Sequence, residues 1–167
     1  FGYNGSENFA KGKRFGFFPS LAIGWLMSEE PWMQKYHKTF NKIKFRASVG
    51  KAGDDNIGGR RFAYLTTMNT NAEGYVWGTT GQSSYTGITE GDIGVSNLTW
   101  ETVKKYNVGF ELGLWNMLDF NLDIFRENRS NIFMKRTIIP TQSGFINAPW
   151  ANFGKVTNGG VDMSLNF

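Results

Sequence analysis

The stretch that decides the fold class is FGFFPSLAIGWLMSEEPW, residues 15–32. Most even-numbered positions between residues 15 and 28 hold Gly, Ser or Ala, whereas every odd-numbered position is apolar: Phe15, Phe17, Pro19, Leu21, Ile23, Trp25 and Met27. Alternate side chains of a β-strand point to opposite faces, so this segment forms a ribbon with one bulky apolar face and one nearly bare face. Something apolar has to cover the first face.

The composition favours strands and turns over helices. Aromatic residues make up 16% of the 167 residues, and the chain holds 21 Gly and only 4 Pro. The net charge is +4, but Lys and Arg are scattered singly or in pairs, so no nucleic-acid partner is expected. The absence of Cys excludes disulfides and thiolate metal sites. No apolar run approaches the length of a membrane helix, although a membrane strand needs only about 9 to 11 residues.

The alternation of the first segment returns in four later segments, at residues 42–49, 105–114, 118–124 and 161–167, within expected strands at 42–50, 102–114, 118–130 and 160–167. In each of them apolar side chains occupy one parity, and polar, charged or small residues occupy the other. Alternation over this length predicts strands that present one apolar and one polar face.

Parity also predicts how residues 105–114 pair with the strand that starts with residues 118–124. The apolar residues are even-numbered in both segments, so they share a face only if the numbers of paired residues add to an even number. This condition excludes a two-residue loop and places Leu114 opposite Leu118, in a hairpin with a three-residue loop. The same register predicts two further pairs, Phe110 with Leu122 and Lys105 with Glu127.

Short and long connections alternate along the chain, which is typical of outer-membrane barrels with short periplasmic turns and long external loops. Two long, weakly patterned intervals, residues 54–100 and 130–156, are therefore expected at the cell surface. Pro19 cannot donate to a strand ladder and is expected near the outer rim, where pairing begins. Aromatic residues at the strand ends predict two interfacial girdles, with Trp25, Trp32 and Trp115 at one end and Phe15, Phe17, Trp100 and Tyr106 at the other.

The charged residues favour a membrane barrel over a soluble sandwich. A Lys or Arg that faces lipid near the midplane costs about 2 to 4 kcal/mol, and Lys44 and Arg46 avoid the apolar parity. A hydrated, charge-balanced lumen wall is expected instead, formed by Lys42, Lys44, Arg46, Lys105, Glu111, Asp119 and Asp123. Residues 1–167 are thus predicted to be all-β, with antiparallel up-and-down strands forming part of a large transmembrane β-barrel. The open alternative is a secreted β-sandwich module that binds carbohydrate.

Five segments, in this order, carry a family likeness. They are RFGFFPSLAIGWLMSEEPWM (14–33), NKIKFRASVGKAGDDN (41–56), LTWETVKKYNVGFELGL (98–114), FNLDIFRENRSNIF (120–133) and NFGKVTNGGVDMSLNF (152–167). Together they resemble the later barrel strands of SusC-like (RagA-type) TonB-dependent outer-membrane transporters. The likeness covers almost the whole chain, apart from residues 60–95.

The resemblance implies a barrel of about 22 strands, closed by an N-terminal plug, in the outer membrane. It also implies that a surface lipoprotein of the SusD type caps the barrel, and that oligosaccharides or peptides are imported with energy passed through TonB. Since this sequence contains neither the plug nor the segment that contacts TonB, it is expected to be part of a longer protein. The expected partners are the SusD-like lipoprotein, TonB through that N-terminal region, outer-membrane lipid and the imported substrate.

The sequence offers no catalytic set, and neither an enzyme activity nor a cofactor nor a metal is expected. His37 is the only histidine, which leaves no His-based triad, and neighbouring carboxylates such as Glu29 and Glu30 point opposite ways on a strand. The better candidates are loop residues, because aromatic rings stack on sugar faces and peptide side chains while Asn, Asp and Arg supply directional hydrogen bonds. The candidate substrate-binding residues are Tyr64, Tyr75, Trp77, Tyr85, Trp150, Arg60, Arg61, Asp54 and Asn56.

Overall fold

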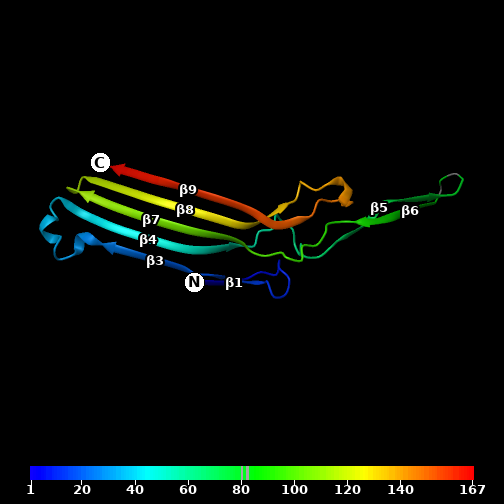
Figure 1. The fold of residues 1–167 in the computed structure, drawn as a ribbon, viewed down its shortest axis with the longest axis horizontal. Coiled ribbons are helices and arrows are strands. Elements are labelled where there is room, and N and C mark those ends of the chain that lie inside the picture. Colours follow the sequence, from blue (N-terminus) through cyan, green and yellow to red (C-terminus); the bar gives the residue numbers. More distant parts are fainter. Residues whose placement is uncertain (80, 82) are drawn as a thin grey trace.

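The computed structural model describes residues 1–79, 81 and 83–167. Its main body is an antiparallel sheet of five strands in the order β3-β4-β7-β8-β9 (Figure 1). The bounds are Ser20–Leu26 for β3, Phe40–Asp54 for β4, Glu101–Leu114 for β7, Leu118–Lys135 for β8 and Trp150–Asn166 for β9. Each strand neighbours the next strand of the main sheet along the chain, which is the up-and-down order that the sequence predicts.

Two small hairpins and three short 3-10 helices complete the fold. One hairpin pairs β1 (Gly2–Gly5) with β2 (Phe15–Phe18), and the other pairs β5 (Met68–Trp77) with β6 (Ser83–Glu90). The helices are η1 (Met27–Glu29), η2 (Gln34–Tyr36) and η3 (Thr141–Ser143). Among the described residues, no helix combines the length and the apolar character needed to cross a membrane.

The register between β7 and β8 confirms the parity argument. Leu114 lies opposite Leu118, with the pairs Phe110–Leu122 and Lys105–Glu127 further along. The three-residue loop holds Trp115 and Asn116 at φ 53°, in the left-handed region, and the Met117 N–H donates to the Leu114 carbonyl at 3.0 Å. The apolar side chains of both strands therefore share one face of the sheet.

The predicted strand over residues 15–28 is divided in two. Pro19 separates β2, which pairs with β1, from β3, which pairs with β4. Proline has no N–H to donate, but its carbonyl accepts a bond of 2.9 Å from the Lys51 N–H. Pairing of β3 with β4 begins at the next residue, Ser20 opposite Gly50, as expected for a proline at the start of the ladder.

Strands extend further into both predicted loops than the alternation indicates. The interval 54–100 contains the β5–β6 hairpin, and the interval 130–156 is shortened by the outer parts of β8 and β9. Register shifts interrupt β8 between Ser130 and Phe133, and Asn131 has a φ of 60°. A bulge of this kind adds one residue to the strand, so every residue beyond it points to the opposite face from the one that its number predicts. A search for strict alternation therefore does not recognise the strand beyond the bulge.

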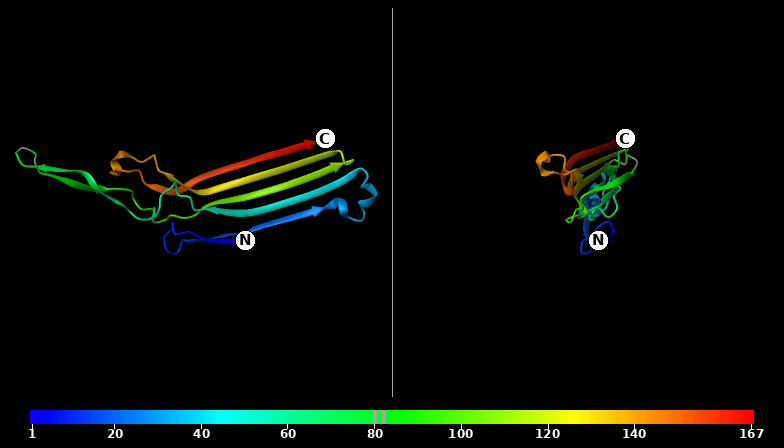
Figure 2. Two further views of the ribbon diagram at one scale, coloured as in Figure 1. Left: turned by 180° about the vertical axis from the view of Figure 1, so that it is seen from behind. Right: turned by 90° about the vertical axis from the view of Figure 1, so that its right-hand side faces the viewer.

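The five strands form one layer, seen from behind in Figure 2, with a distinct residue set on each face. Paired residues place the apolar positions of all five strands on the same face, hereafter the apolar face. Many large apolar side chains there are exposed, from 43% at Phe45 to 71% at Met163, whereas those near the middle of the sheet, such as Phe110 and Leu122, are half-buried and Ile43 is only 8% exposed. A β-sandwich would bury these residues under a second sheet, and none of the described strands lies there, so the sandwich alternative is wrong.

A small core lies at the loop end of the sheet. It consists of Phe9, Phe18, Ile57, Leu98 and Trp100, with Phe9 and Leu98 at 0% and 1% exposure. The Trp100 ring lies 5.1 Å from the Phe9 ring and 5.3 Å from the Phe18 ring. Trp100 is only 8% exposed, so its predicted place in a lipid-facing girdle is wrong. Tertiary packing buries this ring, because the β1–β2 hairpin folds over it.

Candidate functional site

On the face opposite the apolar face, hereafter the polar face, Glu111 of β7 is surrounded by three cations of β4. Its carboxylate lies 2.6 Å from Lys42 Nζ, 3.8 Å from Lys44 Nζ and 3.4 Å from an Arg46 guanidinium nitrogen. Glu111 is 8% exposed, and its backbone is paired with that of Lys44. All four residues belong to the predicted lumen wall, and the register places them on one face because even-numbered residues of β4 are paired with odd-numbered residues of β7.

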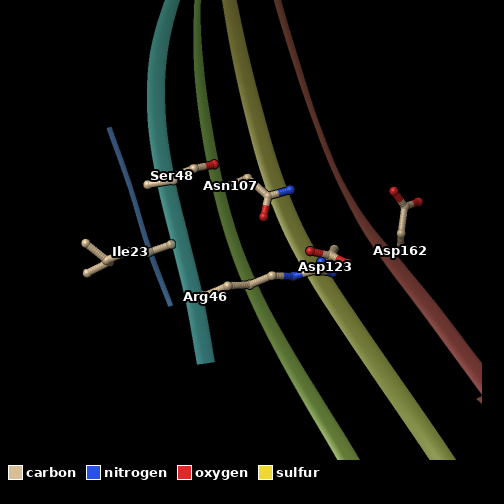
Figure 3. Close-up of a pocket in the computed structure, with 8 residues that line it drawn as sticks. Ile23, Arg46, Ser48, Asn107, Asp123 and Asp162 are labelled. Atoms are coloured by element: carbon tan, nitrogen blue, oxygen red, sulfur yellow. Dashed lines mark hydrogen bonds and ion pairs between the residues drawn. The ribbon is translucent and has the colours of Figure 1, made fainter. Parts of the chain in front are cut away.

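Arg46 also joins β4 to β8 across the intervening strand. Its guanidinium pairs with the Asp123 carboxylate, and Figure 3 shows the side chain crossing β7 to reach it. The residue beneath the crossing is Gly109, which is paired with both Arg46 and Asp123. A Cβ at position 109 would overlap the Arg46 side chain. Glycine at this position is therefore what allows the ion pair to form across three strands.

Around this ion pair the polar face is hollowed by about 490 Å³. In Figure 3, Ser48, Asn107, Asp123 and Asp162 line this side, while Ile23 points to the other face. Asp162 of β9 is paired with Asp123 and adds a carboxylate that the sequence reading did not select. Asp162 occupies a polar position in the alternating residues 161–167, and this pattern could have identified it.

The remaining predicted wall residues also lie on the polar face. Lys105 forms an ion pair of 2.9 Å with Glu127, which the predicted register already places opposite it. Asp119 lies opposite Gly113 and forms no ion pair within the described residues. All seven predicted residues thus share one face, and six of them form ion pairs.

Three of the predicted substrate-binding aromatics gather on the β5–β6 hairpin. The rings of Tyr75 and Trp77 meet edge to face at 4.9 Å, and the backbone of Tyr75 is paired with that of Tyr85. The three side chains are 60–65% exposed. The hairpin projects beyond the loop end of the sheet (Figure 1). These rings, hereafter the hairpin aromatics, are therefore accessible to another molecule.

Two other candidates meet near the start of β9. The Arg60 guanidinium lies 4.6 Å above the Trp150 ring, whose other contact is a stacked Phe133 at 5.2 Å. Arg60 also forms an ion pair of 2.9 Å with Asp92. Tyr64, by contrast, packs against the core around Leu98 and Trp100. Phe133 and Asp92 were not selected from the sequence, because each lies in a stretch without clear alternation.

The last three candidates lie where β4 continues into its loop. The Arg61 guanidinium pairs with the Glu7 carboxylate at 2.7 Å, while Asp54 and Asn56 accept backbone N–H bonds from residues two positions on. Asn56, Arg60 and Arg61 line a polar hollow of about 450 Å³ beside the β1–β2 hairpin. The nine candidates therefore form separate groups at one end of the sheet, and the structure does not bring them into one site.

Comparison with known proteins identifies the relatives of this chain. Residues 1–167 match the family described as TonB dependent receptor-like, beta-barrel. TonB-dependent receptor P26 of Formosa agariphila is 34% identical over 164 residues, covering 98% of this chain and 16% of P26. TonB-dependent receptor SusC of Bacteroides thetaiotaomicron is 30% identical over 167 residues, covering 98% of this chain and 16% of SusC.

A solved structure has the same fold. The RagAB peptide importer in its closed-closed state superposes with a TM-score of 0.75 at 22% identity, covering 98% of this chain and 17% of that one. The chain thus spans about one sixth of the length of the relatives that it matches.

Proposed function

The chain belongs to the TonB-dependent receptor β-barrel family, and on this premise we propose that it forms part of the wall of an outer-membrane importer of glycans or peptides. Proteins of this family reside in the outer membrane and act as transporters rather than as enzymes. The fold described above is that of antiparallel strands from such a barrel, with SusC-like and RagA-like relatives over most of the chain.

The observation that carries the proposal is the contrast between the two faces of the sheet. Large apolar side chains such as Ile23 and Val161 are 68% and 61% exposed on one face, while the acidic residues and their cations occupy the other. An exposed apolar surface of this extent marks a membrane or protein interface. In an outer-membrane barrel the apolar face meets lipid and the polar face meets the aqueous lumen.

In this arrangement the polar face is the lumen wall. Lys42, Lys44 and Arg46 balance Glu111 and Asp123, so a passing substrate meets a hydrated surface of nearly compensated charge. The intervals 54–100 and 130–156, together with their hairpin and strand extensions, lie at the cell surface. The opposite end, with the short β7–β8 turn, faces the periplasm.

Substrate contact is assigned to the loop end, with the hairpin aromatics as its exposed element. Aromatic faces stack on sugar rings and on peptide side chains alike, so these residues fit both substrate classes. RagAB, whose fold this chain shares, is a peptide importer, whereas the resemblance to SusC-like transporters implies glycans as well. A SusD-like surface lipoprotein acts as the lid over the same loops, and TonB supplies the energy.

Uptake measurements test the proposal in the intact receptor, meaning the full protein in which this chain occurs. Cells that carry the receptor are given labelled oligosaccharides or labelled peptides, and the double variant Trp77→Ala/Tyr85→Ala is compared with the parent. We expect uptake of one substrate class to fall by about tenfold, since one stacked ring contributes about 0.5 to 1.5 kcal/mol. Tyr36→Ala is the control, because this ring is 57% exposed but lies at the short-turn end.

Two results contradict the proposal. An intact receptor that is soluble and monomeric without detergent would exclude the membrane barrel. Unchanged uptake of both substrate classes in the double variant would exclude the hairpin aromatics as substrate contacts, while leaving the barrel in place.

A further inference from the structure

The apolar face ends in a row of cations on the side nearest the loops. Lys51 follows Val49 on β4, Lys104 precedes Tyr106 on β7, and Arg126 follows Ile124 on β8, each with the parity of its apolar neighbours. Lys155 of β9 lies opposite Ser130 on the same face. These four residues, Lys51, Lys104, Arg126 and Lys155, are hereafter the cation row. At the short-turn end the same face ends in Trp25, Leu114, Leu118 and Leu165.

No acidic residue in the part of the chain that the structure describes forms an ion pair with the cation row. The five strands lie wholly within the described residues, and every acidic residue in them is on the polar face: Asp54, Glu101, Glu111, Asp119, Asp123, Glu127 and Asp162. None of the four cations forms an ion pair with any described residue. The neighbouring Lys105, one position along β7 but on the polar face, does pair, with Glu127 at 2.9 Å.

Two of these cations are placed where they repel each other. Lys51 and Lys104 are direct cross-strand partners in the β4–β7 ladder. Like charges directly opposite on a sheet are destabilising, and no acidic residue among those described forms an ion pair with either lysine. An anion from outside that lay between the two ammonium groups would relieve this repulsion.

An apolar groove leads away from the same two lysines. A hollow of about 360 Å³ is lined by Leu21, Val49, Lys51, Lys104 and Tyr106, among others. A second hollow of about 220 Å³ shares Leu21, Val49 and Tyr106 and continues along the apolar face over Ala47. The small side chain of Ala47, between Ile23 and Val108, gives this groove its depth. The groove therefore combines an apolar floor with a doubly cationic end.

We propose that this groove binds a single outer-leaflet lipid with an anionic phosphate headgroup. Its phosphate lies between Lys51 and Lys104, and one acyl chain follows Leu21, Val49 and Ala47 toward the middle of the membrane. Arg126 and Lys155 extend the same attraction to neighbouring headgroups along the rim. The inference rests on the proposed function, because the apolar face has to meet lipid and the loops have to lie outside.

The test uses the intact receptor reconstituted in vesicles of phosphatidylcholine and phosphatidylglycerol. Lipids that remain bound after extraction are counted by native mass spectrometry. We expect the parent to retain phosphatidylglycerol in preference, and Lys51→Gln/Lys104→Gln to lower that preference on the order of tenfold. Lys105→Gln is the matched control, since it removes the same charge from the next position of β7 on the opposite face.

Two further variants separate the parts of the site. Ala47→Phe fills the groove and leaves the cations in place, so it is expected to reduce the number of retained lipids. Lys51→Gln/Lys104→Gln, by contrast, is expected to change the headgroup preference of the lipids that are retained. Arg126→Gln/Lys155→Gln removes the outer cations and is expected to have a smaller effect than the double lysine variant. Both variants change residues on the apolar face, away from the buried core around Leu98 and Trp100.

Each remaining outcome counts against the inference. Equal headgroup preference in the parent and in Lys51→Gln/Lys104→Gln would overturn it. Binding of inorganic phosphate that depends on Lys51 and Lys104, with no lipid retained preferentially in the parent, would show a site for free phosphate instead of a lipid. A receptor that does not insert into vesicles at all would contradict the proposed function, so the two failures are distinguishable.

Discussion

The five-stranded sheet and the β5–β6 hairpin are both antiparallel, but their surroundings differ. The sheet sorts most of its side chains between an apolar and a polar face, with four cations at the loop end of the apolar face, and charges on the polar face interact across three strands through Arg46. The hairpin has two strands, most of its residues are exposed, and its ladder shifts register between Asn69 and Tyr75. A sheet between two different solvents has to sort its side chains, whereas a hairpin in one solvent does not.

The largest effect is expected at the junction between these two regions. Trp100→Ala removes a ring that is 8% exposed from the core beneath the loops, and burial of this size corresponds to about 3 to 5 kcal/mol. Hydrogen exchange at Leu98 and Ile57 should therefore become much faster. Protection that remains unchanged there would mean that the loops are held without this core.

A charge on the apolar face tests the sorting itself. Leu122→Arg in the intact receptor is expected to destabilise the protein folded in vesicles by about 2 to 4 kcal/mol, because the guanidinium faces lipid. Asn121→Arg, one position away on the polar face, is the control and should fold like the parent. Equal yields of folded protein for both variants would contradict the assignment of the faces.

The crossing of Arg46 over Gly109 is the next target. Gly109→Ala places a methyl group where the Arg46 side chain lies and is expected to cost about 1 to 3 kcal/mol of unfolding free energy. At Gly24, on the same face, the nearest atom to an added Cβ is 3.9 Å away, so Gly24→Ala should stay within about 0.5 kcal/mol of the parent. Chemical denaturation in detergent measures both, and similar costs would refute the role of Gly109.

The smallest effect is expected from the hairpin. Replacing residues 69–89 with a short Gly/Ser linker should change the unfolding free energy of the barrel by less than about 1 kcal/mol, because loop length contributes only weakly. Thermal unfolding of the intact receptor is the measurement. A large loss of stability would show that the hairpin supports the sheet and does not merely extend from it.

The sheet was predictable from the sequence wherever its alternation is unbroken. Parity alone gives the β7–β8 register from Leu114–Leu118 outward and the shared face of Lys42, Arg46, Glu111 and Asp123. It does not give the outer part of β8, where the bulge near Asn131 changes the parity. It also misses the β5–β6 hairpin, whose residues obey no two-faced pattern because both faces are exposed.

The candidate binding residues divide in the same way. The sequence shows that they are aromatic and polar side chains in long loops, but it does not show which of them lie together. Tyr64 packs into the loop core, Trp150 stacks with Arg60 and Phe133, and only the hairpin aromatics stand free together. Several of these distinctions depend on contacts between segments more than 50 residues apart, such as Arg60 with Trp150 and Arg61 with Glu7, which local periodicity does not encode.

By itself, the sequence determined the all-β class, the sorting of residues between two faces and the likeness to a transporter family. These properties follow from strand periodicity, which every residue of a regular strand repeats. Only the tertiary structure decided that Trp100 is buried, that Arg46 reaches Asp123 over Gly109, and that Lys51 lies opposite Lys104. Each of these depends on which residues of neighbouring strands and loops come into contact, and long-range pairing alone fixes those contacts.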